Sequence, residues 1–128
     1  MLDRTNMNLS IEKTEHYTQI GSDQNYLNQI LAEEIVKQAE EQLSIAATLY
    51  FVFDINKVTE VEADALITLQ TFAMNQMENA GLALFINENR EVHELFSEHD
   101  LVIVPTQSEA VEFIYMDQLE KQFLTDSE

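Results

Sequence analysis

The sequence predicts a single α/β domain with a small, mostly parallel sheet and about four helices. Three apolar runs, each followed by a helical pattern of apolar residues, indicate three strand–helix pairs in succession. Pairs of this kind with short connections build parallel strands joined by right-handed crossovers. The chain of 128 residues, 45% of them hydrophobic, is long enough for one hydrophobic core and too short for two comfortable ones.

Two short strands and a helix are expected before residue 44. Apolar and polar residues alternate weakly over 9–13 and 17–21, which favours strands, and Gly21-Ser22-Asp23 is typical of a turn. After the turn, apolar residues recur three and four positions apart while charged residues occupy the other face, so we expect an amphipathic helix. Its apolar stripe consists of Leu27, Ile30, Leu31, Ile35, Ala39 and Leu43.

The three strand–helix pairs follow. The continuous apolar runs at 49–55, 82–86 and 101–104 are typical of strands buried on both faces. The helix between the first two runs is expected to stop at Gly81, because glycine accepts the backbone conformation that ends helices. The helical stripes are Leu66, Leu69, Ala73, Met77 and Ala80; Val92, Leu95 and Phe96; and Ala110, Val111, Ile114, Leu119 and Phe123. We expect one core that contains Val52, Phe53, Leu69, Leu84, Ile103 and Ile114.

The domain is expected to cover residues 8–124, with disordered ends at 1–7 and 125–128. The formal net charge is −18, from 24 acidic and 6 basic residues. Acidic residues accompany every predicted element, as on a solvated surface. Such a charge repels phosphate backbones and anionic lipids, so neither nucleic acid nor a membrane is an expected partner.

No segment of the sequence predicts export or membrane insertion. The first residues lack the basic region and apolar stretch of a secretory signal. The longest apolar-rich run, 43–53, is far shorter than the about 20 residues that a spanning helix needs. The absence of cysteine is compatible with a reducing compartment. We therefore expect a cytoplasmic protein.

Motifs for catalysis, cofactors and metals are absent from the sequence. The two glycines cannot spell a nucleotide-binding loop, and no serine lies in a nucleophile-elbow context. His93-Glu94-Leu95-Phe96-Ser97 begins like a zinc-protease helix but has serine where the second histidine is needed. The dense carboxylates Glu60, Glu62 and Asp64 are not followed by the glycine and glutamate of a calcium loop. We expect no enzyme, no cofactor and no metal site, although separate carboxylates that meet in space leave a cation site open.

The informative segment joins the first buried run to the following helix. Thr59 and Glu62 have the spacing of a capping box, in which each side chain accepts from the other's backbone N–H. Glu60, Glu62 and Asp64 also complement the positive end of the helix dipole. A helix start that already holds three carboxylates is a poor pocket for a phosphate or a nucleotide.

The order of elements and this junction resemble the STAS domain, the fold of bacterial anti-sigma factor antagonists. The Asp-Ser-Ser-Gly-Leu motif of that family falls on Glu62-Ala63-Asp64-Ala65-Leu66. Gly81-Leu82-Ala83-Leu84 and Val104-Pro105-Thr106, followed by Glu109-Ala110-Val111, resemble the closing pattern of the family. The resemblance covers residues 8–123.

The resemblance implies a docking surface at this helix start. In the family it docks a kinase-type anti-sigma factor, which phosphorylates one serine of the motif and so breaks the complex. Asp64 stands at the phosphoacceptor position and Ala63 at the preceding serine, so this chain is not switched by phosphorylation there. Asp64 supplies about one negative charge where phosphoserine supplies −1.5 to −2. Ala65 replaces the glycine, which indicates an ordinary helical start.

We therefore expect a non-catalytic protein-interaction module that docks a regulatory protein partner. The expected surface consists of Thr59, Glu60, Glu62, Ala63 and Asp64, because strand-to-helix loops at the carboxyl edge of a parallel sheet present the sites of such folds. Thr59 is the nearby hydroxyl, and the expected capping bond makes it a weak phosphoacceptor. Two alternatives stay open. One is a small-ligand or cation sensor that uses surface carboxylates, and the other is an enzyme accessory subunit without a ligand of its own.

Overall fold

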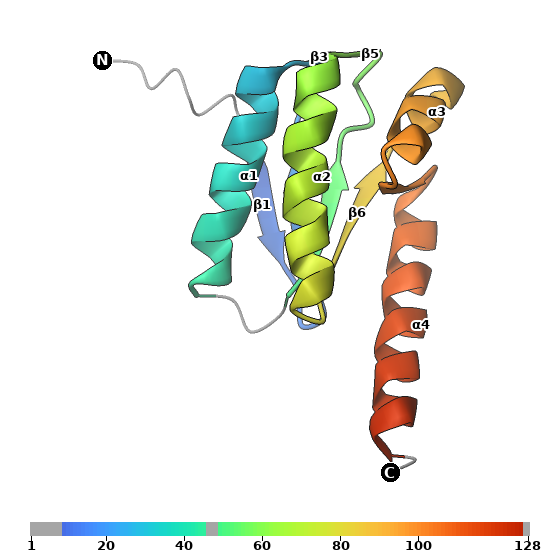
Figure 1. The fold of residues 1–128 in the computed structure, drawn as a ribbon. Coiled ribbons are helices and arrows are strands. Elements are labelled where there is room, and N and C mark those ends of the chain that lie inside the picture. The colour runs from blue at the N-terminus through green and yellow to red at the C-terminus, as the bar shows by residue number, and fades with distance from the viewer. Residues whose placement is uncertain (1–8, 46–48, 127–128) are drawn as a thin grey trace.

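A five-stranded sheet lies between helices on its two faces in the computed structural model of this chain, which describes residues 9–45 and 49–126 (Figure 1). The predicted α/β class, with four helices and a mostly parallel sheet, is confirmed. The strands are β1 (Ser10–Lys13), β2 (Thr18–Gly21), β3 (Tyr26–Leu27), β4 (Tyr50–Asp54), β5 (Glu60–Val61), β6 (Leu82–Ile86) and β7 (Val102–Val104). The helices are α1 (Gln29–Leu43), α2 (Ala63–Glu78), α3 (Arg90–Glu98) and α4 (Gln107–Asp126).

Of the two predicted domain limits, residues 8 and 124, the structure describes only the second. Helix α4 extends through Asp126, whereas the sequence predicted that the domain ends at residue 124. The predicted disordered segment at 1–7 and the last two residues of the chain lie outside the described residues.

The main sheet has the order β1-β2-β4-β6-β7. Strands β1 and β2 form an antiparallel hairpin, and β2, β4, β6 and β7 run parallel to one another. In register, Ile20 lies opposite Phe53, and Phe53 lies opposite Phe85. Because four strands run parallel, their carboxyl ends share one edge of the sheet. The connections that leave this edge include the loop with the candidate docking residues.

The sheet divides the buried residues into two cores. Alternate side chains of β4 and β6 point to opposite faces, as the pleat requires. Phe53 and Leu69 lie in the larger core, under α1, α2 and α3, and the half-buried Ile103 packs against it. Val52, Leu84 and Ile114 lie in the smaller core, under α4. The expectation of one shared core was therefore wrong, because a strand buried on both faces contributes to two layers.

Some residues of the predicted stripes are exposed. Ile30, Met77, Leu119 and Phe123 are each more than half exposed. Most of the predicted stripe in α1 and α2 is nevertheless buried, namely Leu31, Ile35, Ala39, Leu66, Leu69 and Ala73. Helix α2 also buries Gln76, next to the exposed Met77. In α4 the second half runs beyond the sheet (Figure 1). Strand β7 is half-buried and not fully buried as predicted, because it forms the edge of the sheet.

A two-stranded parallel sheet, β3–β5, was not predicted. Tyr26 pairs with Glu60 and Leu27 pairs with Val61. Each strand has two residues, too few for a periodic pattern. The pairing holds the beginnings of α1 and α2 side by side at the same end of the molecule (Figure 1).

Helix α2 ends in a Schellman motif, and the special backbone position is Ala80 rather than the predicted Gly81. Ala80 has φ 67°, and the N–H of Gly81 donates to the carbonyl of Gln76 at 2.7 Å. Gly81 is needed for a different reason, since a Cβ there would lie 2.2 Å from the carbonyl oxygen of Leu49. The two residues thus have separate roles at one turn.

We expect Ala80→Gly to stabilise the protein. Glycine adopts positive φ without the penalty that alanine has there, and this gain outweighs the extra freedom of glycine in the unfolded chain. The free energy of unfolding from urea melts should rise by about 0.5–1 kcal/mol. The neighbouring change Gly81→Ala should lower it by about 1–3 kcal/mol through steric crowding. A decrease for Ala80→Gly would contradict this role of the turn.

Candidate functional site

The five predicted docking residues lie together where the chain leaves β4 and enters α2. Thr59 and Glu60 are exposed in the connecting loop and β5. Glu62 is the half-buried N-cap of α2, and Ala63 and Asp64 are the first two residues of the helix, both exposed. Ala63 and Asp64, the positions matched to the family motif, are thus presented on an accessible helix start. Helix α2 begins in the ordinary way predicted from Ala65, which is buried behind them.

The predicted capping box is wrong. The Glu62 carboxylate accepts from the backbone N–H of Gln29 at 2.7 Å, so it caps α1 and not its own helix. No side chain caps the start of α2. The β3–β5 pairing explains this, because it brings the unpaired N–H at the start of α1 within reach, and the N–H of Glu62 donates to the carbonyl of Leu27 at 2.8 Å. The Thr59 hydroxyl donates only a long bond of 3.5 Å, to the carbonyl of Asn25.

A buried asparagine fixes the loop that leads to this surface. Asn87 is fully buried, and its side-chain amide donates to the carbonyl of Ile55 at 2.6 Å and to that of Val58 at 3.0 Å. Its side-chain oxygen accepts from the backbone N–H of Asn89 at 2.6 Å. The loop after β4 is thereby tied to the connection between β6 and α3. The sequence gives no sign of this role, because an Asn-Glu-Asn segment reads as an ordinary turn.

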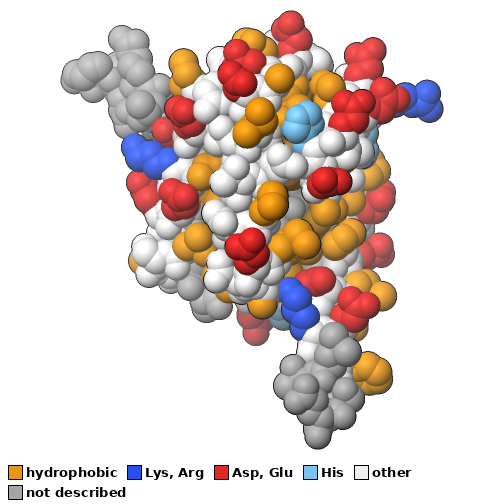
Figure 2. All heavy atoms as spheres, viewed as in Figure 1, with side chains coloured by type: hydrophobic (Ala, Val, Ile, Leu, Met, Phe, Trp, Pro, Cys, Tyr) orange, Lys and Arg blue, Asp and Glu red, His pale blue; other side chains and the backbone are white. Residues whose placement is uncertain are grey.

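The surface around the helix start combines carboxylates with exposed apolar side chains. Ile67 is about half exposed and lies one turn after Ala63 on the same face of α2. Tyr26, also partly exposed, pairs with Glu60 across the small sheet. Figure 2 shows acidic and apolar side chains interspersed at the end of the molecule where α1 and α2 begin. Sequence reasoning placed the carboxylates but missed these apolar neighbours.

The ligand-sensor alternative depends on carboxylates or a pocket that meet at this surface. Within residues 9–45 and 49–126, no three His, Asp or Glu side chains gather closely enough to hold a metal ion. His93 and His99 instead donate ring N–H bonds to the carbonyls of Asn87 and Leu95. The groove along α4 and a shallow hollow between α1 and α2 include none of the five docking residues.

In the part of the chain that the structure describes, no helix has the length and apolar character to cross a bilayer.

A cluster of three titratable side chains on the other side of the sheet fastens α4. Tyr50 donates to the Asp117 carboxylate at 2.6 Å, and Lys121 donates to Asp117 at 2.8 Å, to the Tyr50 oxygen at 2.9 Å and to the carbonyl of Ala80 at 2.7 Å. Burial, and then the bond to Asp117, raises the pKa of Tyr50. Burial opposes the charged forms of Asp117 and Lys121, but their mutual hydrogen bonds and those with Tyr50 outweigh it. These hydrogen bonds lower the pKa of Asp117 and raise the pKa of Lys121.

These shifts predict a loss of stability at alkaline pH. The raised pKa values of Tyr50 and Lys121 mean that their contribution is complete below about pH 10 and is lost as pH rises through the folded-state values. The ion pair of Lys121 with Asp117 is partly exposed, so solvent screens it. We therefore expect the free energy of unfolding from urea melts to fall by about 0.5 kcal/mol between pH 9 and 11. The double change Tyr50→Phe with Lys121→Met should flatten this decline, because it removes both titrating groups, and Lys37→Met, at an exposed lysine of α1, should leave it unchanged. An equal decline in all three proteins would contradict the assignment.

Comparison with known protein families gives no match, and comparison with curated proteins gives none either. Solved structures do match. SpoIIAA, an anti-sigma factor antagonist in its unphosphorylated form, superimposes with a TM-score of 0.68 at 14% identity, over 84% of this chain and 96% of SpoIIAA. A putative anti-sigma factor antagonist from Thermotoga maritima matches with a TM-score of 0.68 at 15% identity, over 88% and 99% of the two chains. The chain has the STAS fold. An anti-sigma factor antagonist from Mycobacterium paratuberculosis also matches, with a TM-score of 0.66 at 11% identity, over 90% and 99% of the two chains.

The STAS fold also occurs inside larger proteins of another kind. The murine Solute Carrier 26 family member A9 anion transporter matches over 82% of this chain but only 18% of its own length, with a TM-score of 0.62 at 11% identity. The predicted resemblance to the STAS fold is therefore confirmed. In this STAS fold, Ala63 and Asp64 occupy the exposed first turn of α2.

Proposed function

We propose that this chain is a non-catalytic protein-interaction module of the anti-sigma factor antagonist type, which docks a regulatory partner through Thr59, Glu60, Glu62, Ala63 and Asp64. The observation that carries the proposal is the exposed start of α2 on a STAS fold, at the carboxyl edge of the parallel sheet. Loops at this edge are where open α/β sheets present their sites. The mixture of carboxylates and exposed apolar side chains there suits a protein partner better than a small ligand.

In this proposal the docking surface is always able to bind its partner, because phosphorylation at positions 63 and 64 does not switch it. SpoIIAA has been described in an unphosphorylated and in a phosphorylated form. In this chain the matched positions carry Ala63 and Asp64, which have no hydroxyl to accept a phosphate. The partner would therefore bind or release for reasons other than modification at this point, such as its own concentration or nucleotide state.

The expected partner is a kinase-type anti-sigma factor with basic groups facing the carboxylates of the surface. The net charge of −18 disfavours nucleic acid and anionic membranes as partners and favours a protein that presents basic groups. Glu60 and Asp64 are exposed and free to face such groups, whereas the carboxylate of Glu62 is engaged with Gln29. Glu60 and Asp64 are therefore the charges to test.

A pull-down from an extract of the native cells tests the proposal. The wild-type chain, Asp64→Arg and Glu91→Arg serve as baits, and the bound proteins are identified by mass spectrometry. Glu91 is a control matched for helix position, because it is likewise the second residue of a helix, α3, and it is not one of the five proposed docking residues. We expect wild type and Glu91→Arg to capture a kinase-like anti-sigma factor and Asp64→Arg to lose it. Equal capture by all three baits, or no such protein on any of them, contradicts the proposal.

Phosphorylation at this surface is expected only after serine is introduced. A STAS-directed kinase should leave the wild-type chain unlabelled near α2, while the double change Ala63→Ser and Asp64→Ser should create an acceptor. The change should cost about 0.3–1 kcal/mol of stability through the lost charge–dipole interaction. Phosphopeptide mapping of the native protein gives the readout. Because Thr59 is exposed and lacks the predicted capping bond, stoichiometric phosphate on Thr59 is the result that would overturn the constitutive reading.

A further inference from the structure

Helix α4 has two apolar faces, and only one of them is packed in the structure. Ala110 and Ile114 are buried against β4 and β6 in the smaller core. Met116 and Phe123 are 67% and 78% exposed. Phe123 lies nine residues after Ile114, about 180° around the helix from it. The second face is therefore not an extension of the core but a separate surface.

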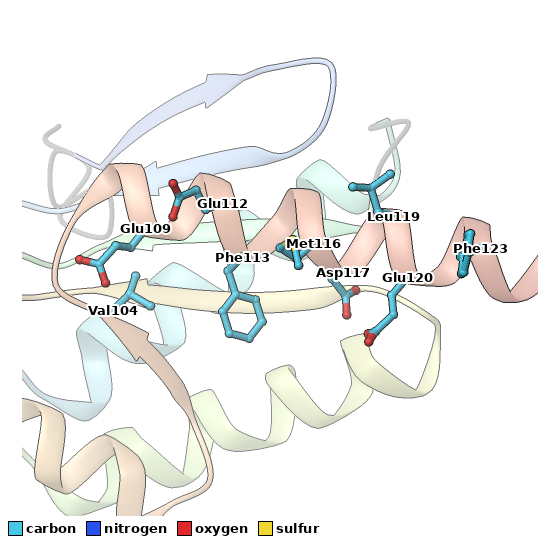
Figure 3. A pocket seen from close by; sticks show the side chains of 9 residues that line it. All are labelled: Val104, Glu109, Glu112, Phe113, Met116, Asp117, Leu119, Glu120 and Phe123. Atoms are coloured by element: carbon cyan, nitrogen blue, oxygen red, sulfur yellow. The ribbon is translucent and has the colours of Figure 1, made fainter.

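This second face lines an open groove of about 810 Å³. Val104 and Glu109 lie at one end and Phe123 at the other, and the side chains between them come from successive turns of α4 (Figure 3). The lining residues are Val104, Glu109, Glu112, Phe113, Met116, Asp117, Leu119, Glu120 and Phe123. Five of the nine are apolar and the other four are carboxylates. A contiguous apolar surface with a polar rim is typical of an interaction site.

The charge of the groove determines what kind of occupant fits it. No Lys or Arg is among its lining residues. The carboxylate of Asp117 is neutralised by Lys121, but those of Glu112 and Glu120 are exposed and have no basic residue in the groove beside them. An occupant must therefore bring positive charge next to an apolar stripe.

A second copy of this chain is a poor occupant by the same argument. Each copy has a net charge of −18, and pairing two α4 grooves would place Glu112 and Glu120 of one copy near the same acidic rim of the other. Like charges at such short range oppose association. Anionic membranes are disfavoured for the same reason.

We propose that the α4 groove is a docking site for a basic amphipathic helix of a partner protein. The stripe from Phe113 to Phe123 spans about 15 Å, enough for roughly three turns of a bound helix with apolar anchors at three- and four-residue spacing. The flexible side chain of Met116 adapts to different anchors. Helices α2 and α4 cover opposite faces of the sheet, so this site is separate from the proposed docking surface around Asp64 and does not depend on it.

The test is a fluorescence anisotropy titration with a labelled probe peptide of about 14 residues, built from leucine and lysine with the leucines on one helical face. It is carried out at physiological ionic strength, where nonspecific attraction between exposed charges is screened. Met116→Ser should weaken binding at least about fivefold. Met77→Ser, at a methionine of α2 that is 62% exposed, should change it less than twofold.

A second pair of variants separates the groove from the overall charge. Glu112→Gln with Glu120→Gln and Glu40→Gln with Glu41→Gln change the net charge equally, but only the first pair lies in the groove. We expect the groove pair to weaken binding at least about fivefold and the α1 pair less than twofold. Equal effects of the two pairs, no binding of the probe, or self-association that Met116→Ser abolishes would each overturn the proposal. Asp64→Arg should leave the binding of the probe unchanged, which keeps the two surfaces distinguishable.

Discussion

Replacing Phe53 with alanine should destabilise the protein by about 3–5 kcal/mol. Phe53 is 1% exposed, in the middle strand of the main sheet. Its ring stacks on Phe85 with centroids 5.0 Å apart and meets Phe72 edge to face at 5.9 Å. The change removes apolar burial, leaves a cavity and breaks aromatic pairs, each of which adds about 0.5–1.5 kcal/mol beyond its buried area.

Urea melts of three variants test this expectation. Phe123→Ala is the control for the loss of a phenyl ring at an exposed position, and it should change the free energy of unfolding by less than about 0.5 kcal/mol. Phe53→Leu keeps most of the apolar volume and should remain folded with a smaller loss than Phe53→Ala. A loss under about 1 kcal/mol for Phe53→Ala would show that the larger core does not depend on this ring.

The sequence could predict the central strands and the helix that begins beside Asp64. Strands β4 and β6 are buried on both faces, so they appear as unbroken apolar runs. The same pattern placed the five candidate residues at the start of this helix, because a parallel strand ends at the edge where its helix begins, and their role in docking stays a prediction. Local sequence was sufficient for these features, since each is encoded within a few neighbouring residues.

The features that were missed depend on contacts between distant residues. Glu62 caps α1 and not α2, because β3 and β5 pair across more than thirty residues of sequence. Helix α4 carries two apolar faces, and the spacing of its residues does not say which one the sheet covers. Asn87 is buried only because two loops meet around it. The periodicity of apolar residues in the sequence does not predict contacts between such distant residues.

Asn87→Ala is expected to cost about 3 kcal/mol and to loosen the proposed docking surface. The change removes the donor to the carbonyl of Val58 and the acceptor for the N–H of Asn89. The carbonyl of Ile55 loses the shorter of its two bonds and keeps the one from the N–H of Val58. A buried group that loses its partner costs about 1–3 kcal/mol, and water that enters the vacated space offsets part of the sum. Because this network holds the loop before Thr59, amide hydrogen exchange over residues 55–62 should become faster than in the wild type.

Asn87→Asp distinguishes the hydrogen bonds from simple packing. Aspartate has nearly the same shape and still accepts from the N–H of Asn89, but it places a carboxylate against the carbonyl oxygens of Ile55 and Val58. It should therefore destabilise the protein at least as much as alanine does. Asn75→Ala, at an exposed asparagine of α2, should change the free energy of unfolding by less than about 0.5 kcal/mol. If Asn87→Asp proves as stable as the wild type, the amide donors do not fix this loop, and the proposed docking surface owes its shape to packing alone.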